Sequence, residues 1–132
     1  MNSRRRVNST VRRLTSTRTN MFLKFEDQTL QAAFIDQLNR AGVPYTIDDN
    51  DAVNFTEAEH SAVADAAHKV RDAQFRWYFL QWPTESQSLR FRSMLEEAGL
   101  PFFVEDHHSG IWFLVRRLDQ PELDRLSQAV DV

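Results

Sequence analysis

The sequence contains no cysteine and only three glycines among its 132 residues. The absence of cysteine excludes disulfides, thiolate zinc sites and cysteine nucleophiles, and it fits a reducing compartment. The glycines, Gly42, Gly99 and Gly110, are far apart, so no glycine-rich phosphate loop is present. No apolar run approaches the roughly 20 residues that span a bilayer, and no secretory signal core is visible. We therefore expect a cytoplasmic protein without membrane association.

The charged residues are unevenly distributed along the chain. The first 20 residues, MNSRRRVNSTVRRLTSTRTN, hold six arginines and no acid, whereas the remainder holds 10 basic and 19 acidic side chains. This composition predicts a disordered basic tail over residues 1–20. The tail could be an arm for nucleic acid or an anionic surface, an organellar presequence, or a leader upstream of a true start at Met21, and we favour the leader. The acidic remainder argues against nucleic-acid binding by any part except the tail.

The body of the chain repeats itself with a shift of 57 residues. Eight positions are identical in the two copies: Phe22 and Phe79, Leu23 and Leu80, Phe34 and Phe91, Leu38 and Leu95, Ala41 and Ala98, Gly42 and Gly99, Pro44 and Pro101, Asp49 and Asp106. One added residue near His107–Gly110 changes the shift to 58 for the last strand. Such an internal repeat constrains the fold.

Each copy predicts the same order of elements. The first copy reads as strand Met21–Phe25, a helix capped by Asp27, strand Tyr45–Ile47, strand Ala52–Phe55 and a helix opened by Thr56 and Glu59. The second reads as strand Phe75–Trp82, a helix opened by Thr84 and Gln87, strand Phe102–Val104, strand Ile111–Arg116 and a helix capped by Asp119. Gly42 and Gly99 stand where a helix ends in a left-handed residue.

The order βαββα, repeated, predicts an α+β fold. We expect two ferredoxin-like repeats, residues 21–74 and 75–132, that form a pseudo-dimer around one shared core. The antiparallel sheet should carry its helices on one face. The alternating pattern of the strands then assigns each remaining side chain to the other face.

That other face is aromatic in the second copy. Its residues are Trp77, Phe79, Gln81, Phe103, Trp112, Leu114 and Arg116. Such a surface is too apolar to be left in water. The two halves could cover it by stacking or by joining edge to edge, or a homodimer or protein partner could cover it. It could also line a small-molecule cleft that includes Asn54. Single-stranded bases are disfavoured, because only Arg76, Arg116 and Arg117 lie nearby.

The run Glu105-Asp106-His107-His108 contains the residue types that bind zinc or nickel. Adjacent residues in a turn point apart, however, and the first copy has Asp48-Asp49-Asn50-Asp51 at the matching place. Both runs therefore read as acidic hairpin turns. The four residues are metal candidates only if a second segment supplies further ligands, for which His60 or His68 of the first copy would serve. We expect no metal and no cofactor. No Ser-His-Asp signature is legible, so the sequence gives no support for an enzyme.

The second copy resembles a known family. The helix end Leu95-Glu96-Glu97-Ala98-Gly99-Leu100-Pro101 and the strand Gly110–Val115 are similar to the small bacterial ferredoxin-like family of signal-transducing proteins, and to the cytoplasmic domain that precedes some bacterial rhomboid proteases. The resemblance implies a ferredoxin-like regulatory or interaction module without catalytic residues. We therefore predict a non-enzymatic module that acts through the aromatic face. The alternative is a ligand- or metal-binding α+β barrel, which could be an enzyme.

Overall fold

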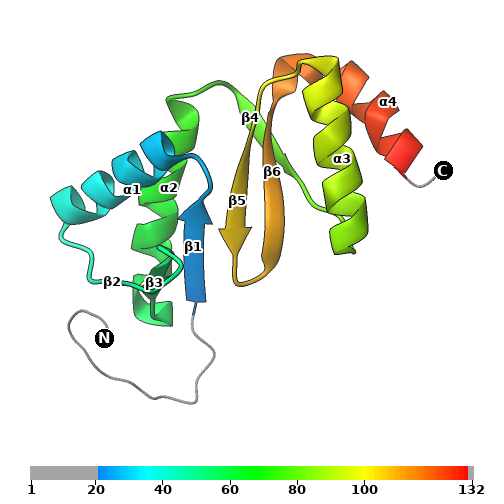
Figure 1. Cartoon of the computed structure of the whole chain (residues 1–132). Coiled ribbons are helices and arrows are strands. Elements are labelled where there is room, and N and C mark those ends of the chain that lie inside the picture. Colours follow the sequence, from blue (N-terminus) through cyan, green and yellow to red (C-terminus); the bar gives the residue numbers. More distant parts are fainter. Residues whose placement is uncertain (1–20, 131–132) are drawn as a thin grey trace.

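The computed structural model describes residues 21–130, so the basic tail of residues 1–20 lies outside the described residues. The elements are β1 (Met21–Phe25), α1 (Gln28–Ala41), β2 (Thr46–Ile47), β3 (Val53–Phe55), α2 (His60–Asp72), β4 (Trp77–Leu80), α3 (Glu85–Ala98), β5 (Phe102–His107), β6 (Gly110–Arg116) and α4 (Gln120–Val130). Short 3-10 turns, η1 (Glu57–Glu59) and η2 (Arg117–Asp119), lead into α2 and α4. The predicted α+β class is confirmed (Figure 1).

Local sequence signals explain where the helices begin and end. The Asp27 side chain accepts a hydrogen bond from the Leu30 N–H and so caps α1. Thr84 and Gln87 form the expected capping box at the start of α3. Gly42 and Gly99 adopt left-handed φ angles of 70° and 68° after α1 and α3, as the repeated Ala-Gly pair predicts.

Within residues 21–130 the strands form one six-stranded antiparallel sheet in the order β2-β3-β1-β5-β6-β4. The halves therefore join edge to edge, through β1 and β5. The row of strands begins at β2 and ends at β4 and does not close on itself. Neither the closed barrel nor the face-to-face stack that the sequence left open is formed.

The expectation that all helices lie on one face is wrong for the whole sheet. Each half carries its two helices on one face, but α1 and α2 lie on one side of the joined sheet and α3 and α4 on the other (Figure 1). The cause is that β1 and β5 pair antiparallel while both halves keep the same strand order, which turns the second half over. The register agrees, because Phe25 is opposite Glu105 rather than the core residue Val104. Since side chains alternate along a strand, Val104 and the second core face the opposite side.

The buried apolar residues form two clusters rather than the single shared core we expected. The cluster under α1 and α2 includes Phe25, Phe34 and Val53. The cluster under α3 and α4 includes Phe91 and Phe113. Three helix alanines, Ala41, Ala62 and Ala98, are exposed and contribute little to either cluster.

The two halves also contact each other through ion pairs on both sides of the sheet. On the α3 side, Arg92 donates two hydrogen bonds to the Glu26 carboxylate, at 2.8 and 2.7 Å. On the α2 side, Arg71 binds Glu105. Each pair joins a helix of one half to residues of the other, so the junction is held on both faces. None of the helices in residues 21–130 is long and apolar enough to cross a membrane.

Candidate functional site

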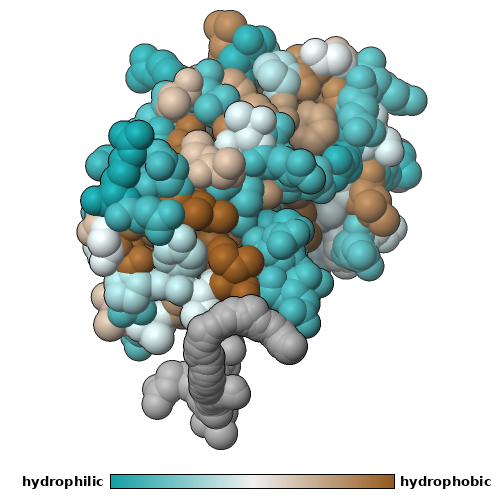
Figure 2. All heavy atoms as spheres, turned by 60° about the vertical axis from the view of Figure 1, so that its left-hand side comes forward, coloured by the Kyte–Doolittle hydropathy of each residue, from teal (hydrophilic) through white to brown (hydrophobic). Residues whose placement is uncertain are grey.

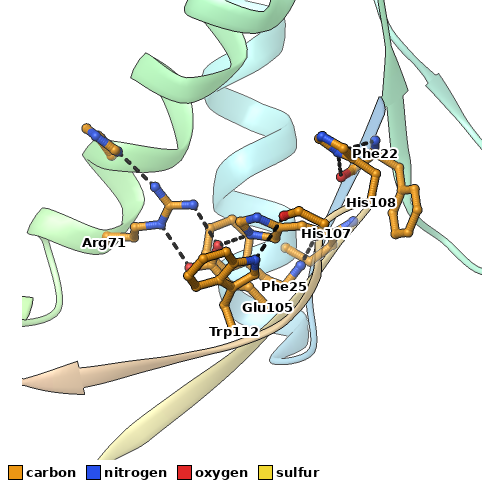
Figure 3. Close-up of polar contacts among 10 residues, drawn as sticks. Phe22, Phe25, Arg71, Glu105, His107, His108 and Trp112 are labelled. Atoms are coloured by element: carbon orange, nitrogen blue, oxygen red, sulfur yellow. Dashed lines mark hydrogen bonds and ion pairs between the residues drawn. The ribbon is translucent and has the colours of Figure 1, made fainter. Parts of the chain in front are cut away.

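Arg71 and Glu105 form a buried ion pair between α2 and β5. Arg71 Nε donates to Glu105 Oε2 at 2.8 Å, and Arg71 Nη2 donates to Glu105 Oε1 at 2.6 Å. Arg71 is 3% exposed and Glu105 is 0% exposed. Two parallel charge-assisted hydrogen bonds fix both distance and orientation. Figure 3 shows the Arg71 side chain reaching from α2 to the strand that carries Glu105.

Two histidines extend this pair into a chain of hydrogen bonds. His107 Nε2 lies 2.7 Å from Glu105 Oε1, and His68 Nδ1 lies 2.8 Å from Arg71 Nη1. Because a guanidinium only donates and a carboxylate only accepts, His68 accepts through Nδ1 and His107 donates through Nε2. His68 is exposed and His107 is partly exposed. The network therefore runs from solvent through the interior and back to solvent.

Half-buried rings flank the network on β4 and β6, and we call Trp77, Phe79 and Trp112 the aromatic row. The ring centroids of Trp77 and Phe79 are 5.0 Å apart, and those of Phe79 and Trp112 are 5.4 Å apart. The Arg71 guanidinium lies 4.7 Å from the Phe79 centroid and 5.3 Å from that of Trp77. These separations suit cation–π attraction, which is strongest where water is excluded.

The pKa of Glu105 lies below its ordinary value. Burial alone raises the pKa, but the hydrogen bonds from Arg71 and His107 favour the ionised form and outweigh the burial. A fully buried carboxylate with a lowered pKa is a weak base that substrate cannot reach. The Arg71–Glu105 pair is therefore better suited to hold the aromatic row in position than to transfer protons.

The structure brings most of the predicted contact residues onto one face of the sheet but leaves few of them free. Leu114 is completely buried, and Phe103 packs against the cluster under α1 and α2. Arg116 is occupied by Asp119, to which its Nε and Nη2 donate at 3.0 and 2.9 Å. The accessible remainder of the predicted face consists of the aromatic row and the exposed Gln81.

Asn54 does not belong to this face. It lies on β3 opposite Phe22, and the register of β1 and β5 places Phe22 on the α3 side of the sheet. Its side-chain amide donates to Asp48 Oδ2 at 2.8 Å, within its own hairpin. The predicted cleft that combined Asn54 with Trp77 and Trp112 is therefore wrong.

The four metal candidates do not converge either. Glu105 and Asp106 point to opposite faces of β5, since successive strand residues alternate. His107 binds Glu105, and His108 Nδ1 is near the backbone of Phe22 (Figure 3). In the described part of the chain, no group of three or more histidine, aspartate or glutamate side chains could hold a metal ion.

Sequence reasoning missed Arg71, and it placed Glu105 in a turn. The second predicted strand ended at Val104, whereas β5 continues to His107, so Glu105 is a strand residue facing α2. A signal for Arg71 was present, because Val63, Ala67 and Arg71 are four residues apart and share one helical stripe. A charge on an otherwise buried stripe requires an opposite charge nearby.

A shallow groove runs beside β4, at the end of the sheet. It is lined by Asp72, Arg76, Trp77, Tyr78, Phe79 and Arg117. Asp72 accepts a hydrogen bond from the Trp77 indole at 2.8 Å, which fixes the ring at the groove wall.

Comparison with known proteins adds no relative: no family model, curated protein or solved structure gives a significant match to the chain.

Proposed function

We propose that this chain is a non-enzymatic regulatory or protein-interaction module and that the aromatic row is its contact surface. The observation that carries the proposal is the position of the row: its rings are partly exposed, and the Arg71 guanidinium that binds Glu105 lies over the rings of Trp77 and Phe79. Aromatic side chains dominate binding energy at protein interfaces. A row already fixed before binding loses little conformational entropy when a partner arrives.

The scatter of exposed apolar residues over the described surface favours a specific contact over non-specific adhesion. Figure 2 shows the molecule turned so that the side with α1 and α2 comes forward, and apolar atoms reach this surface in small groups among hydrophilic ones. The exposed large hydrophobic residues among residues 21–130, Ile47, Leu89, Ile111 and Leu118, lie on separate elements. An anchor surrounded by polar atoms is typical of a transient interface.

We also propose that the fold is a duplication of a ferredoxin-like unit and that the protein is cytoplasmic. In support, both halves run strand, helix, strand, strand, helix, and both order their strands second, third, first within the sheet. The cysteine-free composition fits a reducing compartment. The halves join head to tail, through the first strand of one and the second strand of the other, and not across a twofold axis.

Site-specific photo-cross-linking tests the proposed contact surface. A photoreactive phenylalanine analogue at position 112 should give a discrete adduct in cells, either with a partner protein or with a second copy of the chain. The matched control is position 89 on α3, where Leu89 is 61% exposed on the other side of the sheet. Equal adducts at both positions, or none at position 112, would remove the support for the aromatic row.

A further inference from the structure

We infer that the free edge of β4 binds an extended acidic segment of the partner as a seventh strand of the sheet. The inference rests on the proposed function, since Trp77 and Phe79 of the aromatic row belong to β4. Of the two ends of the sheet, β2 comprises only two residues, whereas β4 comprises four. Very short edge strands offer little to pair with, so β4 is the edge that can take a strand.

The backbone of β4 presents regularly spaced polar groups at this edge. The Arg117 N–H donates to the Arg76 carbonyl at 2.8 Å. Hydrogen-bonded pairs alternate along an antiparallel ladder, so Arg76, Tyr78 and Leu80 direct their backbone groups toward β6. Trp77 and Phe79 consequently direct their N–H and C=O groups outward. Two such residues form the repeat that an added strand needs.

The charges beside this edge specify an acidic occupant. Arg76 and Arg117 line the groove along β4. Within residues 21–130 every other arginine except Arg90 forms an ion pair with a carboxylate. The Arg117 guanidinium lies 5.6 Å from the Tyr78 ring centroid, and the residue is exposed. A strand carrying glutamate or aspartate would supply the carboxylates that both arginines lack.

The remaining contacts fit the same occupant. Side chains of an added strand would alternate between the Trp77 and Phe79 side and the Tyr78 and Leu80 side. Asp72, the one acid lining the groove, is already bound to the Trp77 indole and turned toward the ring. The edge therefore combines main-chain pairing, aromatic contact and two cations.

Chemical-shift titration of the full-length protein, labelled with nitrogen-15, tests the inference. The probe is a capped heptapeptide of alternating glutamate and valine. We expect the largest shifts at the amides of Trp77 and Phe79. An N-methylated peptide of the same sequence keeps its charge but cannot pair with a strand, so any binding to the arginine-rich residues 1–20 persists while the β4 shifts disappear. Equal β4 shifts with both peptides, or none with either, would overturn the inference.

Charge reversal provides the matched control. Arg76→Glu with Arg117→Glu should weaken binding of the acidic peptide by about tenfold at low salt. Arg90→Glu, at an exposed arginine of α3 away from the β4 edge, should change it less than about twofold. If the Trp112 cross-link persists while the β4 variants change nothing, the edge inference fails and the proposed function stands. Concentration-dependent β4 shifts without peptide would indicate a second copy and would also overturn it.

Discussion

Replacing Glu105 by glutamine should strongly destabilise the protein. The substitution keeps the shape of the side chain and removes the charge that neutralises Arg71, which is 3% exposed. Removing one partner of a buried pair leaves an uncompensated charge, at a cost of about 3–5 kcal/mol. This is a large part of the roughly 5–15 kcal/mol that stabilises a typical domain.

Urea unfolding followed by tryptophan fluorescence measures the loss directly, because Trp77 and Trp112 lie beside the pair. The control is Arg92→Met, which breaks the exposed pair with Glu26 and should cost about 1 kcal/mol or less. The double variant Arg71→Met with Glu105→Leu should recover much of the loss, since apolar residues can replace a buried pair. A loss below about 1 kcal/mol for Glu105→Gln would refute the assignment of a buried, mutually dependent pair.

Acidification provides an independent check on the same carboxylate. The pKa of Glu105 is lower in the folded protein than in the unfolded chain, because the hydrogen bonds from Arg71 and His107 outweigh the effect of burial. The unfolded chain therefore binds more protons below the ordinary glutamate pKa of 4.5. The stabilisation is fully present above that pH and is lost as the pH falls toward the folded pKa. Glu105→Gln should make the acid limb of the stability profile flatter, and an unchanged slope would contradict the direction of the shift.

Three further substitutions give distinct expected outcomes in the same urea assay. Gly99→Ala should cost about 1–2 kcal/mol from its left-handed φ of 68° alone, because an added Cβ meets nothing within 4 Å. Gly110→Ala should cost more, since its Cβ would lie 2.6 Å from the Gln81 amide nitrogen; equal losses would show that Gln81 moves away freely. Thr84→Ala should cost about 1 kcal/mol by removing the capping box of α3, and no loss would mean that water replaces the cap.

The sequence predicted the order and type of the elements because their signals are local, although β5 runs beyond the predicted end at Val104 and β4 is shorter than the predicted strand Phe75–Trp82. Asp27 and Thr84 cap their helices and Gly42 and Gly99 end them. Alternation along the strands agrees with the cores, where Leu23, Phe25 and Phe113 are buried. These features depend on spacing within a few residues. The repeat also predicted the same element order in both halves, and that order is observed.

The arrangement of the two halves in the sheet could not be predicted from such local signals. It depends on the register of β1 with β5, where residues 86 positions apart in the chain come into contact. The antiparallel pairing of β1 with β5, in which Phe25 is opposite Glu105, places the helices on two faces. The same pairing determines which residues make up the candidate site. It places Glu105 beside Arg71, and it leaves Asn54 on the opposite side of the sheet from the aromatic row.

The long separation between β1 and β5 has a kinetic consequence. Each half can assemble most of its own contacts first, whereas the joining strands must wait for a loop of more than 80 residues to close. Interactions absent from the transition state govern how fast a native protein opens. If the Arg71–Glu105 ion pair forms after the transition state, it lowers the unfolding rate of the protein and leaves the folding rate nearly unchanged.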